Sequence, residues 1–266
     1  NKEVDCKPEE SIYFDLEHYV YKKPKCIGVF GACVYNKKNK KINVTQYMIE
    51  NKSEVVDILL LAKKYFIKMK REGKKVIVTF AGNNDFTVIK YLFNKYGIYF
   101  DFEKEFKSID IQKEYEKDMK ISIGLKNLEK IFEVYREGDV ISGSNLAKTF
   151  HKVLKDKEYI QRMPKEKIET ILQYNEQDVV NLYKIFINWK NYIKTEEDTK
   201  ENDDFDEIKE IKTEQIINDI KEIDNEKNIE DVKKEQENNT NDNIIIIEDN
   251  GQQEENKEID NSETII

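Results

Sequence analysis

The chain of 266 residues has no apolar stretch long enough to cross a bilayer and no secretory signal pattern. It has only three cysteines, Cys6, Cys26 and Cys33, without the spacing of a metal site. Cys26 and Cys33 fall in an apolar, strand-like run, so we expect buried thiols and a reducing, cytoplasmic compartment. The first residue is Asn1 rather than Met, which is compatible with a portion of a longer protein.

Charge is unevenly distributed along the chain. Residues 195–266 contain 26 acidic and 8 basic residues, with one Phe and no Tyr or Trp. Their net charge is −18, and since the whole chain carries −9, residues 1–194 carry +9. A basic domain attracts phosphate backbones, whereas so polar a tail cannot offset its ordering entropy by burial. We predict a lead-in over 1–10, a folded domain over 11–194 and a disordered acidic tail over 195–266.

Two more specific roles for the acidic tail stay open beside that of a solvated segment of like charge. The tail could fold back on the basic domain and imitate nucleic acid, which would give autoinhibition. Alternatively residues 243–248, Asn-Ile-Ile-Ile-Ile-Glu, could bind a protein partner as a short strand.

The hydrophobic pattern of the first part predicts an α/β domain. Five segments have the apolar content of strands: residues 11–17, 26–35, 42–49, 76–80 and 106–111. Amphipathic helices are predicted from Ser53 to Gly73, over 84–96 and through most of 112–193, the last opening at Pro164. This order fits a ribonuclease H-like fold, in which helices flank a five-stranded mixed sheet. Three antiparallel strands would be followed by two parallel ones.

Four carboxylates stand at the edges of apolar segments, where an unpaired charge is costly. Asp15 and Glu17 end the first strand and, two residues apart, face the same side. Asp85 falls in the first turn of the helix after the fourth strand. Tyr174 and Asp178 share a face of the last helix. Four converging acids would repel by about 4 kcal/mol per pair at ~4 Å and an effective dielectric near 20, so the pattern favours divalent cations.

Each of these acids also has an ordinary structural interpretation. Asp15 and Glu17 could lie at a solvated strand end, and Asp178 could be an inert surface residue. Asp85 could cap its helix or interact with the helix dipole. His18, beside the acid pair, could contact phosphate or solvent.

Together, Asp-x-Glu at a strand end, Asp at a strand-to-helix turn and Tyr-x3-Asp on a late helix resemble the DnaQ-like 3′–5′ exonucleases of the DEDDy branch. Within it, the segments Gly124–Glu129 and Arg136–Gly143 are similar to those of the YprB-like ribonuclease H-like family. The resemblance extends over about residues 11–190. Two features depart from that family: the order Ala-Gly-Asn-Asn-Asp-Phe over 81–86, and Tyr174 where many members have His.

The resemblance implies a nuclease with a two-metal-ion mechanism. Asp15 would bridge two Mg²⁺ or Mn²⁺ ions, and Glu17 and Asp178 would hold the ion that activates water. Asp85 would support the second ion, and Tyr174 would orient the attacking water. Hard oxygen ligands suit both metals, and two ions about 3.5–4 Å apart stabilise an in-line displacement.

Lys126, Arg136 and Lys148 are candidate nucleic-acid contacts. Each could instead be a solvated charge, and Arg136 could form an internal ion pair with Asp139. We expect DNA or RNA as partner, with a single-stranded 3′ end, and the sequence does not indicate an oligomeric state. The alternative function is a weak or inactive nucleic-acid-binding module of a larger repair or RNA-processing protein.

Overall fold

The computed structural model describes residues 6–138 and 141–193, and the predicted acidic tail lies outside them. A five-stranded mixed sheet has the order β3-β2-β1-β4-β5. The strands are Ser11–Tyr21 (β1), Lys23–Asn36 (β2), Lys41–Met48 (β3), Val76–Thr79 (β4) and Lys107–Asp110 (β5). The first three pair antiparallel, and β4 pairs parallel with both β1 and β5. The predicted ribonuclease H-like sheet is confirmed.

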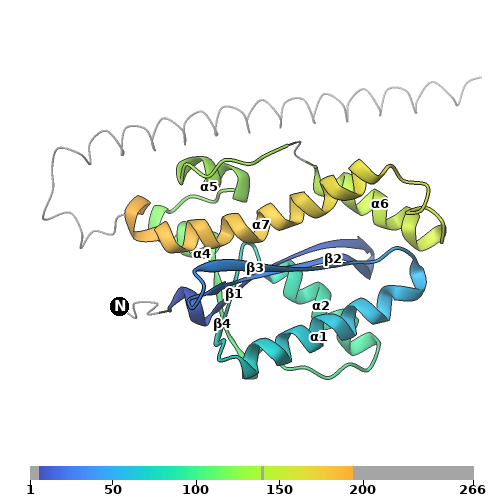
Figure 1. The fold of residues 1–266 in the computed structure, drawn as a ribbon, viewed down its shortest axis with the longest axis horizontal. Helices are drawn as coiled ribbons and strands as arrows, with labels where there is room; N and C mark the ends of the chain where they lie inside the picture. The colour runs from blue at the N-terminus through green and yellow to red at the C-terminus, as the bar shows by residue number, and fades with distance from the viewer. Residues whose placement is uncertain (1–5, 139–140, 194–266) are drawn as a thin grey trace, which may run out of the picture. The chain divides into compact units, whose positions relative to one another are not determined.

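Helices cover both faces of this sheet. They are Val55–Arg71 (α1), Asn83–Lys95 (α2), Phe102–Glu105 (α3), Ile111–Met119 (α4), Leu125–Ile131 (α5), Gly143–Lys155 (α6) and Lys165–Tyr192 (α7). α1 and α2 lie on one side, and α6 and α7 lie on the other (Figure 1). The four-residue α3 was not predicted, because it is too short to show a helical period. None of the described helices is long and apolar enough to span a membrane.

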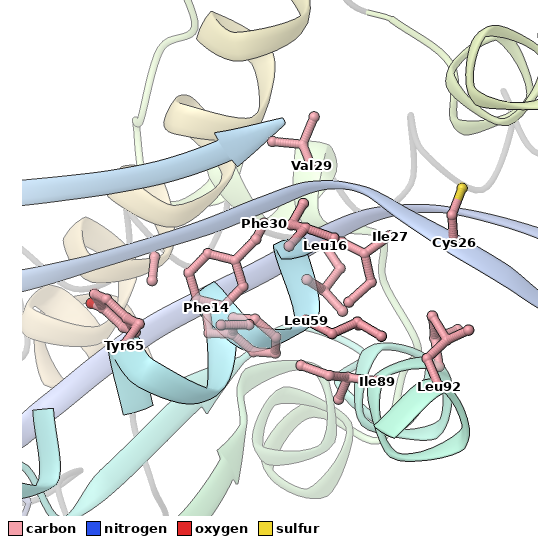
Figure 2. Packing of buried hydrophobic residues seen from close by; sticks show 14 of the residues in the cluster. Phe14, Leu16, Cys26, Ile27, Val29, Phe30, Leu59, Tyr65, Ile89 and Leu92 are labelled. Atoms are coloured by element: carbon pink, nitrogen blue, oxygen red, sulfur yellow. The ribbon is translucent and has the colours of Figure 1, made fainter. Parts of the chain in front are cut away.

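β1 separates the two layers through the alternation of its side chains. The ring of Phe14 lies 5.4 Å from that of Phe66 on α1, while the ring of neighbouring Tyr13 lies 5.2 Å from that of Tyr183 on α7. Figure 2 shows Phe14 and Leu59 in the core beneath the sheet. Burial of such side chains stabilises the fold by about 1.5–3 kcal/mol each. Asp15 and Glu17 share the parity of Tyr13, and therefore face α7.

A bulge in β2 follows the acid pair of β1. Glu17 pairs with Val29 and His18 with Ile27, so Gly28 has no partner on β1. A Cβ on Gly28 would lie 2.2 Å from the Phe150 ring, so the missing side chain admits α6 close to the sheet. Bulges bend a strand and re-aim its side chains, and this one shifts the pairing of β1 with β2 directly after Glu17.

Candidate metal centre

Three carboxylates meet between β1 and α7. Asp15, Glu17 and Asp178 each present an oxygen within 4.8 Å of the others. Glu17 is 9% exposed and Asp178 is 6% exposed. The strand brings two acids to one face and the helix brings the third, which is the convergence that the sequence pattern predicted for these residues. Oxygen ligands of this kind, gathered and largely buried, fit a hard divalent cation.

Asp85 lies beside this group rather than within it. It falls in the first turn of α2, where predicted, and is 6% exposed. The N-cap residue of α2 is Gly82 and no side chain caps the helix, so capping does not explain Asp85. Burial raises the pKa of Asp85, and repulsion by Asp15 and Glu17 raises it further. The Oδ1 of Asp85 is 3.9 Å from His18 Nε2, which places this histidine at the edge of the site.

The electrostatics of the group favour a bound cation. Burial raises the pKa of Asp15 to about 8, with repulsion from Asp178 as the next cause. Burial raises the pKa of Asp178 to about 6, although Arg136 opposes the rise. Burial and Asp15 hold the pKa of Glu17 well above its usual range. The neighbouring Arg136 and Lys126 lower these pKa values, but not enough to offset burial and mutual repulsion. A bound divalent cation would relieve the repulsion between the ionised acids.

Two side-chain amides in series, those of Gln46 on β3 and Asn175 on α7, connect to the Asp15 carboxylate on β1 by hydrogen bonds. Asn175 Nδ2 on α7 donates to Asp15 Oδ2 at 3.1 Å. Gln46 Nε2 on β3 donates to Asn175 Oδ1 at 2.9 Å and to the Leu172 carbonyl at 2.8 Å. Gly31, which pairs with Asp15, leaves the space that Asn175 occupies. These contacts fix the Asp15 carboxylate, since each polar atom of the buried Asn175 amide has a partner.

Asp178 is held by a second network. The Arg136 guanidinium donates through Nε and Nη2 to both oxygens of Glu129, each at 2.6 Å, and through Nη2 to Asp178 Oδ1. Asn181 Nδ2 donates to Glu129 Oε1 at 3.0 Å. Asn175, Asp178 and Asn181 recur every three residues on the buried face of α7. That helix therefore organises both networks.

Tyr174 stands at the outer edge of the site. Its ring lies 4.9 Å from Lys126 Nζ and 5.3 Å from the Arg136 guanidinium carbon. Burial and the nearby Asp178 raise the pKa of Tyr174 above its ordinary value. The phenol therefore stays protonated at neutral pH, which suits a hydrogen-bond donor that orients water rather than a general base.

Asp110 sets the turn that precedes Asp85. Its carboxylate accepts hydrogen bonds from Ala81 N at 3.0 Å, Gly82 N at 3.1 Å and Gln112 N at 3.1 Å. Ala81 has a φ of +52°, a left-handed conformation that is uncommon for a residue with a Cβ. Asp110, at the end of β5, thus holds a strained turn and caps α4 at the same time.

The three predicted nucleic-acid contacts lie in different surroundings. Lys148 is exposed on α6, and Lys126 is partly buried beside Tyr174. Arg136 is engaged with Glu129 and Asp178, so it does form an internal ion pair, though with other partners than the predicted Asp139, which lies outside the described residues. Contact of any of the three with nucleic acid stays a prediction.

Five residues that support the site were not predicted: Gln46, Asp110, Glu129, Asn175 and Asn181. Asn175 carried a usable signal, because it lies three residues before Asp178 and so shares the inward face of α7. Glu129 and Asp110 had a weaker sequence signal, because each is an acid next to apolar residues expected to be buried. Gln46 had no sequence signal for a role in the site, since a glutamine on an outer strand is usually solvated.

The sheet, its order and the carboxylate group define the class to which the protein belongs, that of RNase H-like nucleic-acid hydrolases. Residues 12–190 match the family model RNase_H_2, described as RNase_H superfamily. The match extends over well more than half of the chain, and the chain belongs to this family. A search of curated proteins found no match.

Proposed function

We propose that the protein is a metal-dependent 3′–5′ exonuclease of the YprB-like, DEDDy type that hydrolyses phosphodiester bonds of DNA or RNA. The observation that carries the proposal is the gathering of Asp15, Glu17 and Asp178 within 4.8 Å in a largely buried site. Family membership supports nucleic acid as the substrate. The spacing of Tyr174 and Asp178 on one face of α7 supports the DEDDy type.

Each site residue has a role in this proposal. Asp15 would contribute to both ions, Glu17 and Asp178 would hold one of them, and Asp85 would support the second. Bound Mg²⁺ or Mn²⁺ would activate water and stabilise charge on the entering and leaving oxygens.

The remaining residues would orient the attacking water and neutralise the phosphate charge of the bound strand. Tyr174 offers a protonated phenol to the attacking water, and its raised pKa supports that role. Lys126, beside its ring, neutralises phosphate near the site, while Lys148 on α6 contacts the strand further away. Such phosphate contacts position the strand without reading its sequence.

Cleavage of end-labelled single strands tests the proposal. The protein is incubated with 5′-labelled DNA or RNA and Mg²⁺ or Mn²⁺. We expect a ladder of products shortened from the 3′ end, and none in EDTA. Asp15→Asn and Asp178→Asn should abolish the ladder, whereas Asp57→Asn, which changes an exposed acid on α1, should leave it unchanged.

Two other outcomes would contradict the proposal. Internal cuts without a ladder would identify an endonuclease. Strand binding without cleavage under either ion would identify a nucleic-acid-binding module.

A further inference from the structure

A buried guanidinium lies against the candidate metal centre. The side chain of Arg136 is 10% exposed and that of Glu129 is 3% exposed. Two parallel hydrogen bonds join them, from Nε and Nη2 to the two carboxylate oxygens, each 2.6 Å long. Such a bidentate pair is strong and fixes the plane of the guanidinium. Glu129 therefore determines where the charge of Arg136 lies.

The loop after α5 reverses the chain and so places Arg136 beside Glu129. The Val134 amide donates to the Glu129 carbonyl at 2.8 Å, and Glu133 between them adopts a left-handed φ of +53°. Further on, the Glu137 amide donates to Gln177 Oε1 at 2.9 Å, and Gln177 Nε2 donates to the Glu137 carbonyl at 2.7 Å. A tight turn on one side and a reciprocal clamp to α7 on the other thus hold the arginine.

Arg136 reaches only one oxygen of Asp178. Nη2 donates to Oδ1, and within residues 6–138 and 141–193 no hydrogen bond to Oδ2 is found. A guanidinium at this place has two opposite effects on a cation site. It orients the carboxylate, which favours binding, and its positive charge repels a divalent ion, which opposes binding. Pairing with Glu129 cancels most of the repulsion and keeps the orientation.

We infer that Glu129 and Arg136 are a positioning pair of the metal centre: Glu129 neutralises and fixes the guanidinium, which then orients Asp178 without withdrawing it from the cation. The inference rests on the proposed metal-dependent function. Without Glu129, the uncompensated arginine would bind Asp178 through its full charge and compete with the metal. A pair that only stabilised the fold would leave metal affinity unaffected.

Calorimetric titration of the full chain with Mn²⁺ tests the inference. Relative to wild type, Glu129→Gln should raise the dissociation constant about ten-fold, as outer-shell substitutions do. Glu129→Gln combined with Arg136→Gln should recover only part of that loss, because the repulsive charge is then gone but Asp178 is no longer oriented. Glu166→Gln makes the same change of charge at an exposed residue in the first turn of α7, and should bind Mn²⁺ as wild type does.

Thermal unfolding without metal, run in parallel, separates folding from binding. Should Glu129→Gln fail to fold, Arg136→Lys carries the test, because lysine keeps the charge but cannot span Glu129 and Asp178. That variant should bind Mn²⁺ several-fold more weakly, and an unchanged constant would overturn the inference.

The titration also separates this inference from the proposed function. Wild type that binds Mn²⁺ no more tightly than Glu129→Gln would overturn the positioning role and leave the metal centre in place. A double variant as weak as the single one would overturn the charge argument, and with it the inference. Wild type that does not bind Mn²⁺ would overturn both proposals.

Discussion

A Cβ atom on Gly31 would lie 2.0 Å from Oδ1 of Asn175, so the amide occupies the space in which a larger residue of β2 would project. Gly31 is also the partner of Asp15 across the sheet. The missing side chain therefore lets α7 approach, and Asn175 donates its hydrogen bond to the Asp15 carboxylate. Close packing between β2 and α7 positions one acid of the site.

Gly31→Ala should displace Asn175 and loosen the contact of α7 with the sheet. Overpacking of this kind costs about 1–3 kcal/mol, which denaturant unfolding followed by circular dichroism would measure. Gly143→Ala is the control, because a Cβ there would meet nothing within 4 Å. Equal midpoints for the two variants would contradict the packing argument.

Asp110→Ala should lower the free energy of unfolding by about 2–3 kcal/mol, because three backbone amides lose a charged acceptor. Asp101→Ala should lose about 1 kcal/mol, because Asp101 caps α3 through one amide, that of Lys104. Denaturant unfolding compares the two. Losses of equal size would show that Asp110 does not hold the turn before Asp85.

Stability without metal should depend on the protonation of Asp15. Its pKa is raised to about 8, against about 3.9 in an unfolded chain. Between these values the folded state holds a proton that the unfolded state lacks, so stability falls as pH rises, by at most about 1.4 kcal/mol per pH unit.

In EDTA, the free energy of unfolding of wild type should therefore fall more steeply from about pH 5 to about pH 8 than that of Asp15→Asn. Mn²⁺ should flatten the wild-type profile, since a bound cation favours the ionised acid. Asp57→Asn should keep the wild-type slope. Parallel profiles for wild type and Asp15→Asn in EDTA would contradict the raised pKa.

Tyr174→Phe should lower the cleavage rate about ten-fold or more by removing the phenol that orients water, while Mn²⁺ affinity stays unchanged. Single-turnover cleavage and calorimetry measure the two quantities. Tyr183→Phe, on the same helix but packed against Tyr13 and Tyr35, is the control. A full cleavage rate in Tyr174→Phe would remove this residue from the site.

Lys148→Ala should weaken strand binding and reduce the dependence of affinity on salt by about one phosphate contact. Fluorescence anisotropy at several salt concentrations, in Ca²⁺ to slow cleavage, measures both effects. Lys64→Ala removes an exposed lysine from α1, on the opposite side of the sheet, and should change neither. Identical slopes for both variants would place the strand elsewhere.

The acids of the site were predictable from the sequence because their positions depend on local periods. The two-residue repeat of β1 puts Asp15 and Glu17 on one face, and the helical repeat puts Tyr174 and Asp178 on another. A local period does not distinguish a helix-capping Asp85 from one that faces the other acids. The structure excluded capping, because α2 begins without a side-chain cap and Asp85 is buried near the other acids.

By itself, the sequence determined the order of the strands and of the helices other than the short α3, since these follow from the spacing of apolar residues, and that order in turn indicated the mixed sheet and the acids at its edges. Only the tertiary structure decided which neutral and charged groups hold those acids. Asn175 is 160 residues from Asp15, and Gln46 is 129 residues from Asn175. Such contacts arise when α7 packs on the sheet, and no local period encodes which amide then meets which carboxylate.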